Sequence, residues 1–197
     1  MTINDKILDL LNKHNGIVSA ADVVSLGFSR NLLSVYVRNG LLTRVKHGYY
    51  SLTDTIEDDM YTLSLGCKNI VFSHESALFL NGISERTPFE HTVTIPNNTS
   101  LAAKVRDKCK CHYVNPDVYE LGIITRKTVF GNEVRCYNAE RTICDLIKAK
   151  NKIDIETLTA GIKNYAASKD KNIAQLGTYA AKLNVLKEVQ MYMGVLL

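Results

Sequence analysis

The sequence has no long apolar segment, and this limits the classes of protein to which it can belong. None of its apolar runs approaches the ~20 residues that a membrane-spanning helix needs. From Met1 to Leu11, charged and apolar residues alternate at helical spacing, which differs from the apolar core of a secretion signal. With 46% apolar and 22% charged residues, the composition is that of a globular protein in water. We therefore expect a cytoplasmic protein.

A paired set of cysteines for a disulfide framework is also lacking. The five cysteines are odd in number and scattered, so we expect reduced thiols. Cys109, Cys111 and His112 lie close enough in sequence to suggest a zinc site. Zinc sites, however, usually leave about two to four residues between cysteines and need further ligands, and no second Cys/His pair has suitable spacing. We expect no bound metal and no cofactor.

Acidic residues are absent between Asp22 and Asp54, and this absence points to a partner. The same window contains Arg30, Arg38 and two further basic residues, so its local field is positive. The net charge of the whole chain is only +4, and four acids within residues 54–60 separate two basic parts. A phosphate backbone would be attracted to the acid-free window.

The stretch Ile17 to Leu52, around which the chain is organised, has the pattern of a winged helix-turn-helix. Ser19 is an N-cap for a short helix that ends near Leu26, before Gly27. Ser29 is an N-cap for the second helix, and a β-hairpin follows, with its turn at Lys46, His47 and Gly48.

The second helix of this motif has one face suited to packing and one suited to reading base pairs. Its outward stripe combines arginine, amide and hydroxyl groups with one small apolar side chain, which suit guanine, adenine and a thymine methyl. The candidate DNA-binding residues are Arg30, Asn31, Ser34, Val35 and Arg38 on the helix and Arg44, Lys46 and His47 on the hairpin. A helix-turn-helix that binds protein, with ordinary solvated basic residues, is the alternative.

The remaining pattern predicts a second domain of the α+β class. We expect a winged helix-turn-helix domain over residues 1–55, completed by a helix from Ile3 to His14, and a mixed α/β domain over residues 56–197 that ends in a helical tail. The expected elements of the second part are a connecting helix over 54–65, strands at 70–72, 91–95, 111–114, 122–126, 128–130 and 133–137, and helices at 74–80, 101–108, 139–148, 154–167, 173–183 and 185–196.

A nuclease or hydrolase built on this second domain is the alternative function. Ser73, His74 and Glu75 start a helix, where neighbouring side chains point in different directions, and no nucleophile elbow accompanies them. Asp117 and Glu133 imitate the acid pattern of metal-dependent nucleases. The expected lysine is Arg135, which cannot release a proton to activate water. We expect no enzymatic activity.

The most informative stretch of the second domain is Asn138 to Lys148. Arg141 and Asp145 are one helical turn apart and can pair, although a surface pair contributes only about 0.3 to 0.5 kcal/mol. The two residues therefore either orient a neighbouring element or belong to a contact surface. Lys148 and Lys150 add positive charge next to them, as a solvated helix face would also do.

Three segments of the sequence together resemble the AbiEi antitoxins of bacterial type IV toxin–antitoxin systems. They are GFSRNLLSVYVRNGLLTRVKHGYYSL, then FSHESALFLNGISERTPFEHTVTIPNN, and then YNAERTICDLIK. With the flanking helices, the resemblance covers essentially the whole chain. It implies an N-terminal winged helix-turn-helix and a C-terminal antitoxin domain.

The resemblance also implies a function in phage defence by abortive infection. Proteins of this kind bind inverted repeats in their own promoter and repress the operon, and they counter a nucleotidyltransferase-type toxin without a stable complex. Arg30, Asn31, Ser34 and Arg38 would enter the major groove, with Arg44 and Lys46 on the wing. The antitoxin surface would include Arg141, Asp145, Lys148 and Lys150. Because inverted repeats need two copies, we expect a monomer that binds DNA cooperatively or a weak dimer.

Overall fold

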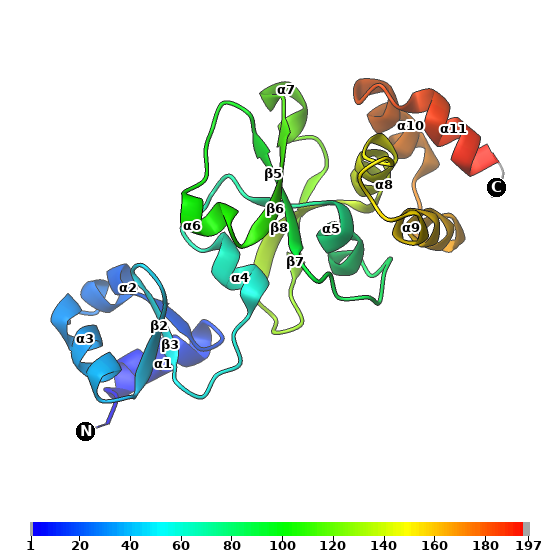
Figure 1. Ribbon diagram of the computed structural model, residues 1–197. Helices are drawn as coiled ribbons and strands as arrows, with labels where there is room; N and C mark the ends of the chain where they lie inside the picture. Colours follow the sequence, from blue (N-terminus) through cyan, green and yellow to red (C-terminus); the bar gives the residue numbers. More distant parts are fainter. Residues whose placement is uncertain (1, 195–197) are drawn as a thin grey trace. The chain divides into compact units, whose positions relative to one another are not determined.

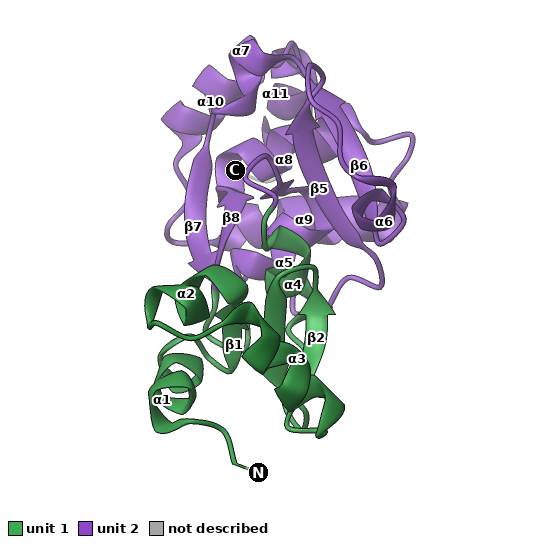
Figure 2. Cartoon of the chain, turned by 90° about the vertical axis from the view of Figure 1, so that its left-hand side faces the viewer, with its two compact units in different colours: residues 1–66, 127–132 green, residues 67–126, 133–197 purple. Residues whose placement is uncertain are grey.

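The structure is a computed structural model that describes residues 2–194 of the 197-residue chain. It contains two compact units, which Figure 2 colours separately. The first comprises residues 1–66 together with 127–132, and the second comprises residues 67–126 and 133–197. The division into functional domains after residue 55 stays a prediction, while the first compact unit continues to Gly66.

The first unit combines helices with a three-stranded antiparallel sheet. Its helices are α1 (Asp5–Lys13), α2 (Ala20–Ser25), α3 (Arg30–Arg38) and α4 (Asp59–Ser64). Its strands are β1 (Ile17–Ser19), β2 (Leu42–Lys46) and β3 (Tyr49–Leu52), in the order β1-β3-β2. Strand β1 was not among the elements expected from the sequence.

The helix starts of this unit follow local capping chemistry. The Ser19 hydroxyl accepts a hydrogen bond from the Asp22 backbone N–H at 3.1 Å, and the Asp22 carboxylate accepts one from the Ser19 N–H at 3.3 Å. Ser29 holds the N-cap position of α3 with an extended backbone, but its side chain makes no cap hydrogen bond, contrary to our expectation. The helix begins there because the backbone turns, without help from the hydroxyl.

The core of the first unit fixes the rotation of α3. Ile7 and Leu11 of α1 pack with Leu33 and Tyr36 of α3, and all four are at most 3% exposed. The Tyr36 hydroxyl also accepts a hydrogen bond from the Asn4 backbone N–H at 3.0 Å. Because residues three apart lie on the same side of a helix, the opposite side of α3 faces outward.

Asp58 anchors the loop 127–132 within the first unit. Its carboxylate accepts hydrogen bonds from the Tyr61 backbone N–H at 3.0 Å, the Thr128 hydroxyl at 2.5 Å and the Asn132 amide at 2.9 Å. The first of these caps α4, so the connecting helix starts at Asp59 and not at the predicted residue 54. The strand expected at 128–130 is wrong, because Thr128 turns inward and its N–H donates to the Asn132 carbonyl within the loop.

The second unit is built on a five-stranded mixed sheet. Its strands are β4 (Val71–Phe72), β5 (His91–Pro96), β6 (Cys109–Val114), β7 (Ile123–Lys127) and β8 (Glu133–Tyr137), in the order β6-β5-β4-β8-β7. Strand β4 is antiparallel to β5 and parallel to β8, and β5 is parallel to β6. The sequence therefore correctly predicted a mixed α+β fold.

Helices α5 and α8 to α11 gather on one side of this sheet (Figure 1). The helices of the unit are α5 (His74–Leu80), α6 (Ala103–Arg106), α7 (Pro116–Tyr119), α8 (Ala139–Lys148), α9 (Ile155–Ala167), α10 (Ile173–Lys182) and α11 (Leu186–Gly194). Helix α8 packs against α5, α9 and α10 through Ile143, Leu146 and Ile147, which are at most 1% exposed.

One short helix differs from the expected elements, and one expected helix end lies outside the described residues. The short helix α7 was not predicted; Asn115 caps it by accepting a hydrogen bond from the Asp117 N–H at 3.1 Å. The last helix was expected to end at Leu196, which lies outside the described residues. Across residues 2–194, no helix has the length and apolar character needed to cross a membrane.

Candidate nucleic-acid interface

The outward face of α3 carries the side chains that the sequence analysis assigned to it. Arg30, Asn31, Ser34 and Arg38 are exposed, and Val35 is half-buried between them. These five recur at spacings of three, four and one along the helix, which places them on one stripe. Neither arginine forms a hydrogen bond or ion pair with another described residue, so both guanidinium groups are available to a partner.

The β2–β3 hairpin presents two more of the candidate residues. Arg44 and His47 are exposed, and the Arg44 guanidinium lies 2.6 Å from His47 Nδ1. Gly48 closes the turn with φ +79°, a left-handed conformation that suits glycine. The hairpin tip is therefore basic and sharply turned.

Lys46 is used differently from our expectation. Its ammonium donates hydrogen bonds to the backbone carbonyls of Thr62 at 3.4 Å, Leu63 at 3.1 Å and Leu65 at 2.5 Å, at the carboxyl end of α4. A register shift between Arg44 and Lys46 breaks the simple alternation of β2, so these two residues do not share a face as expected. Lys46 compensates the negative end of the α4 dipole, and the assignment to phosphate contact is corrected on this ground.

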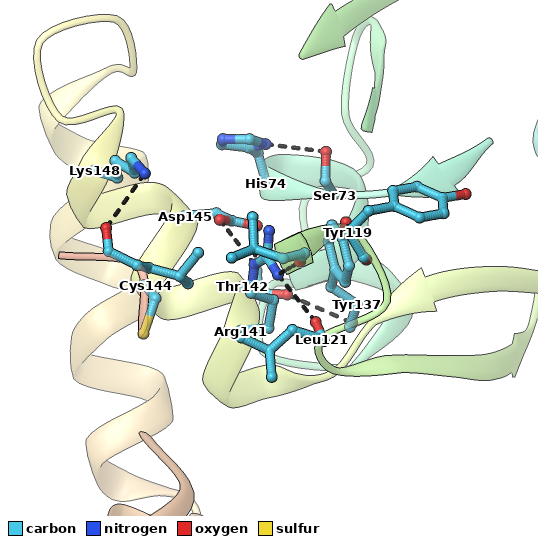
Figure 3. A network of polar contacts seen from close by, with 12 residues as sticks. Ser73, His74, Tyr119, Leu121, Tyr137, Arg141, Thr142, Cys144, Asp145 and Lys148 are labelled. Carbon is cyan, nitrogen blue, oxygen red and sulfur yellow. Dashed lines mark hydrogen bonds and ion pairs between the residues drawn. The ribbon is translucent and has the colours of Figure 1, made fainter. Parts of the chain in front are cut away.

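In the second unit, Arg141 of α8 is the centre of a buried polar network (Figure 3). Its Nε donates to both carboxylate oxygens of Asp145 at 3.0 Å, and its Nη1 donates to the carbonyls of Val118 at 2.5 Å and Leu121 at 3.1 Å. The guanidinium lies 4.3 Å from the centre of the Tyr137 ring. Through these hydrogen bonds, Arg141 connects helix α8 with the segment that includes α7.

This placement decides between two interpretations of the Arg141–Asp145 pair. Arg141 is 0% exposed and Asp145 is 6% exposed, so neither belongs to a protein-contact surface, and our expectation of an antitoxin surface at these two residues is corrected. Burial raises the pKa of the Asp145 carboxyl, while the Arg141 charge opposes that rise. Lys148 is exposed and Lys150 is half-buried, and the latter lies 3.9 Å from Glu188.

The structure groups several residues that the sequence analysis did not combine. His74 is 4% exposed, has φ +47° and stacks on His112 with ring centres 3.9 Å apart. Burial lowers the pKa of His74 well below its ordinary value, and it also lowers the pKa of His112. The two histidines are 38 positions apart in sequence, so no local spacing signals their contact.

The cysteines next to His112 behave as thiols in a strand. Cys109 Sγ and Cys111 Sγ are 3.6 Å apart, and burial raises the pKa of Cys109 to about 12. Within residues 2–194, no group of three or more His, Cys, Asp or Glu side chains is arranged to hold a metal ion. Asp117 and Glu133, which define the alternative nuclease pattern, are exposed on α7 and at the start of β8.

Comparisons with known proteins bear on both units. The fold resembles the crystal structure of the RV2827C protein from Mycobacterium tuberculosis, with a TM-score of 0.65 and 12% sequence identity, over 96% of this chain and 80% of that chain. This likeness concerns the fold. A search of curated proteins finds no match. Residues 5–53 match the family model described as "Transcriptional regulator, AbiEi antitoxin". Residues 5–53, which hold α1 to α3 and the hairpin, are thus similar to the AbiEi antitoxin family of transcriptional regulators.

Proposed function

We propose that the protein binds double-stranded DNA through a winged helix-turn-helix and represses its own operon. The observation that carries this proposal is the outward face of α3, where the exposed guanidinium groups of Arg30 and Arg38 have no partner within residues 2–194. An arginine without a protein partner, on a helix that packs through its other face, is free to form a bidentate contact with guanine.

The dimensions of α3 suit the major groove. With its side chains an α-helix is about 10 to 12 Å across, and the nine residues from Arg30 to Arg38 extend roughly 12 Å along the axis, at about 1.5 Å for each of the eight steps. The major groove is about 12 Å wide and admits one helix. Asn31, Ser34 and Val35 lie between the arginines on the same stripe and would contact base edges, while Arg44 and His47 of the hairpin would contact phosphate.

Repression from inverted repeats requires two copies of the chain on one operator. We propose a monomer that binds cooperatively on DNA, or a weak dimer, acting in the cytoplasm. A helix-turn-helix pair binds half-sites whose centres are about 10 base pairs or a multiple of this apart, so the operator repeats should have that spacing.

We further propose that the protein is the antitoxin of a type IV system for phage defence, and that it acts without enzymatic activity. Its functional partner would be a nucleotidyltransferase-type toxin, countered without a stable complex. The family match over residues 5–53 supports the antitoxin assignment. Co-expression of the chain with the toxin encoded next to it should restore growth, while purification of the chain should recover no toxin.

The test of DNA reading is the Arg38→Ala variant on the upstream operator. If Arg38 reads a base, binding weakens by about 1 to 3 kcal/mol, or about fivefold to 150-fold in Kd, and discrimination at one base pair is relaxed. Lys13→Ala is the matched control, since Lys13 is an exposed cation on α1 of the same unit.

A gel-shift or anisotropy titration measures both variants at several salt concentrations. The parent affinity should fall steeply with salt, as release of counterions from DNA requires. Equal affinities of Arg38→Ala, Lys13→Ala and the parent would remove Arg38 from the DNA-reading face. Binding without salt dependence would favour a protein partner.

A further inference from the structure

The second unit contains a cavity of about 600 Å³ that the DNA-binding proposal does not use. It opens where strands β5 and β6 meet the helices α7, α8 and α10, and every residue that lines it belongs to this unit. Cavities of about 300 to 1,000 Å³ are typical of small-molecule sites. Its polar lining includes Thr94, His112, Arg141, Lys148, Lys152 and Lys182.

Arg141 supplies a buried donor that the protein leaves unused. Its Nε and Nη1 bind Asp145 and two backbone carbonyls, but Nη2 has no hydrogen-bond partner among the described residues. The side chain is 0% exposed and lines the cavity. Leaving a buried donor unsatisfied costs about 1 to 3 kcal/mol, and more for a charged group. A bound ligand that accepts a hydrogen bond from Nη2 would explain this unsatisfied donor.

Two more polar atoms of the cavity wall have no partner within residues 2–194. They are Thr94 Oγ1 and His112 Nε2. Thr94 of β5 and His112 of β6 are paired directly across the parallel strands, so both lie at one position of the sheet. Since burial keeps the stacked imidazoles of His74 and His112 uncharged at neutral pH, they act in this cavity as hydrogen-bond partners and add no charge.

The charges of the cavity favour an anion. Lys148, Lys152 and Lys182 line it, and all three are exposed at its edge. The carboxylate of Asp145 is already paired with Arg141, so Asp117 is the one remaining acid among the lining residues. Three ammonium groups opposite one carboxylate suit a ligand that carries more than one negative charge.

We propose that this cavity binds a small phosphorylated organic molecule, with its phosphate held by Arg141 Nη2 and the lysines. A phosphate offers several acceptor oxygens and up to two negative charges, which matches a guanidinium donor together with surrounding ammonium groups. The cavity volume greatly exceeds that of a phosphate ion, and the half-buried Val114 and Val118 provide apolar wall for an organic part. This proposal is independent of DNA binding by α3.

Isothermal titration of the full chain with AMP, glucose 6-phosphate, pyrophosphate and citrate would test the proposal, with uncharged adenosine as the control for charge. We expect AMP or glucose 6-phosphate to bind, and adenosine to bind at least tenfold more weakly than AMP if the phosphate contributes as a charge-assisted contact of about 1.5 kcal/mol. Preference for citrate over every phosphorylated probe would overturn the choice of phosphate.

Variants locate the site without disturbing the Arg141 network. Lys182→Ala should weaken the affinity for AMP or glucose 6-phosphate by about twofold to fivefold, the range for an exposed charge pair. Thr94→Val preserves side-chain shape and should weaken it by about twofold to tenfold if the hydroxyl binds the ligand. Lys163→Ala, an exposed lysine of α9 that does not line the cavity, should leave the affinity unchanged.

The Arg38→Ala variant distinguishes binding in the cavity from binding at α3, because the exposed arginines of α3 could also attract a phosphorylated probe. Unchanged probe affinity in Arg38→Ala, with a loss in Lys182→Ala, would support the cavity. Equal losses in Lys182→Ala and Lys163→Ala, a loss confined to Arg38→Ala, or no binding of any phosphorylated probe at millimolar concentration would refute it.

Discussion

Removal of the Asp145 carboxylate should destabilise the second unit strongly. In the parent, both carboxylate oxygens accept hydrogen bonds from Arg141 Nε at 3.0 Å, and no other ion pair among the described residues involves this arginine. In Asp145→Ala the guanidinium would remain 0% exposed without a counter-charge, because the carbonyls of Val118 and Leu121 still hold it in place. Loss of one partner from a buried pair costs about 3 to 5 kcal/mol.

The reciprocal variant, Arg141→Leu, should show a characteristic pH dependence. It leaves Asp145 buried without its cation, and burial already raises the pKa of that carboxyl in the parent. With the folded pKa above the unfolded value, the folded state binds the proton more tightly, so Arg141→Leu should be more stable near the unfolded pKa and lose stability as pH rises through the folded pKa. The parent should show less of this slope.

Urea unfolding followed by far-ultraviolet circular dichroism measures these free energies, with the double variant Arg141→Leu/Asp145→Ala closing the cycle. Residues in direct contact typically show coupling of about 0.5 to 3 kcal/mol, so the double variant should be more stable than the two single losses imply. Lys150→Ala is the control, since the Lys150–Glu188 pair is half exposed at 3.9 Å and should contribute at most about 1 kcal/mol. Loss of less than about 1 kcal/mol in Asp145→Ala would refute the buried-pair account.

Three further variants test individual contacts. Lys46→Met should lower the stability of the first unit by about 1 kcal/mol, because it removes the cation from the end of α4, and should leave the salt slope of operator binding unchanged; a slope reduced by about 1 would return Lys46 to the DNA interface. Asp58→Ala removes the acceptor for Thr128 and Asn132 and should speed proteolysis in the loop 127–132, whereas Asp58→Asn should have a smaller effect because it keeps one oxygen; equal cleavage of both and the parent would contradict this. The pKa of buried His74 is lowered, so the parent should lose stability as pH falls below about 6.5 toward the folded pKa, by up to about 1.4 kcal/mol per pH unit. His74→Asn should flatten this pH slope of stability, because asparagine tolerates the positive φ and does not titrate. The slope that remains would come from His112, whose pKa is also lowered. An unaltered slope in denaturant titrations would refute the assignment of the pH dependence to His74.

The sequence alone determined the features that depend on neighbouring residues. The bounds of α5 and α8, the N-cap at Ser19 and the apolar and polar faces of α3 follow from contacts within one or two helical turns. The exposure of Arg30 and Arg38 follows from the burial of Leu33 and Tyr36 on the same helix. The absence of acids between Asp22 and Asp54 is a property of the sequence and needs no fold.

Only the tertiary structure decided how the remaining polar groups are used. The sequence around Lys46 is compatible with a phosphate contact and with a contact to the carbonyls at the end of α4. The register shift in β2 turns Lys46 to the face on which it donates to those carbonyls. Arg141 and Asp145 were recognised as a pair, but their burial depends on α7, which lies more than 20 positions away. Thr94 and His112 meet because β5 and β6 run parallel, and sheet pairing between distant segments leaves no periodic signal in the sequence.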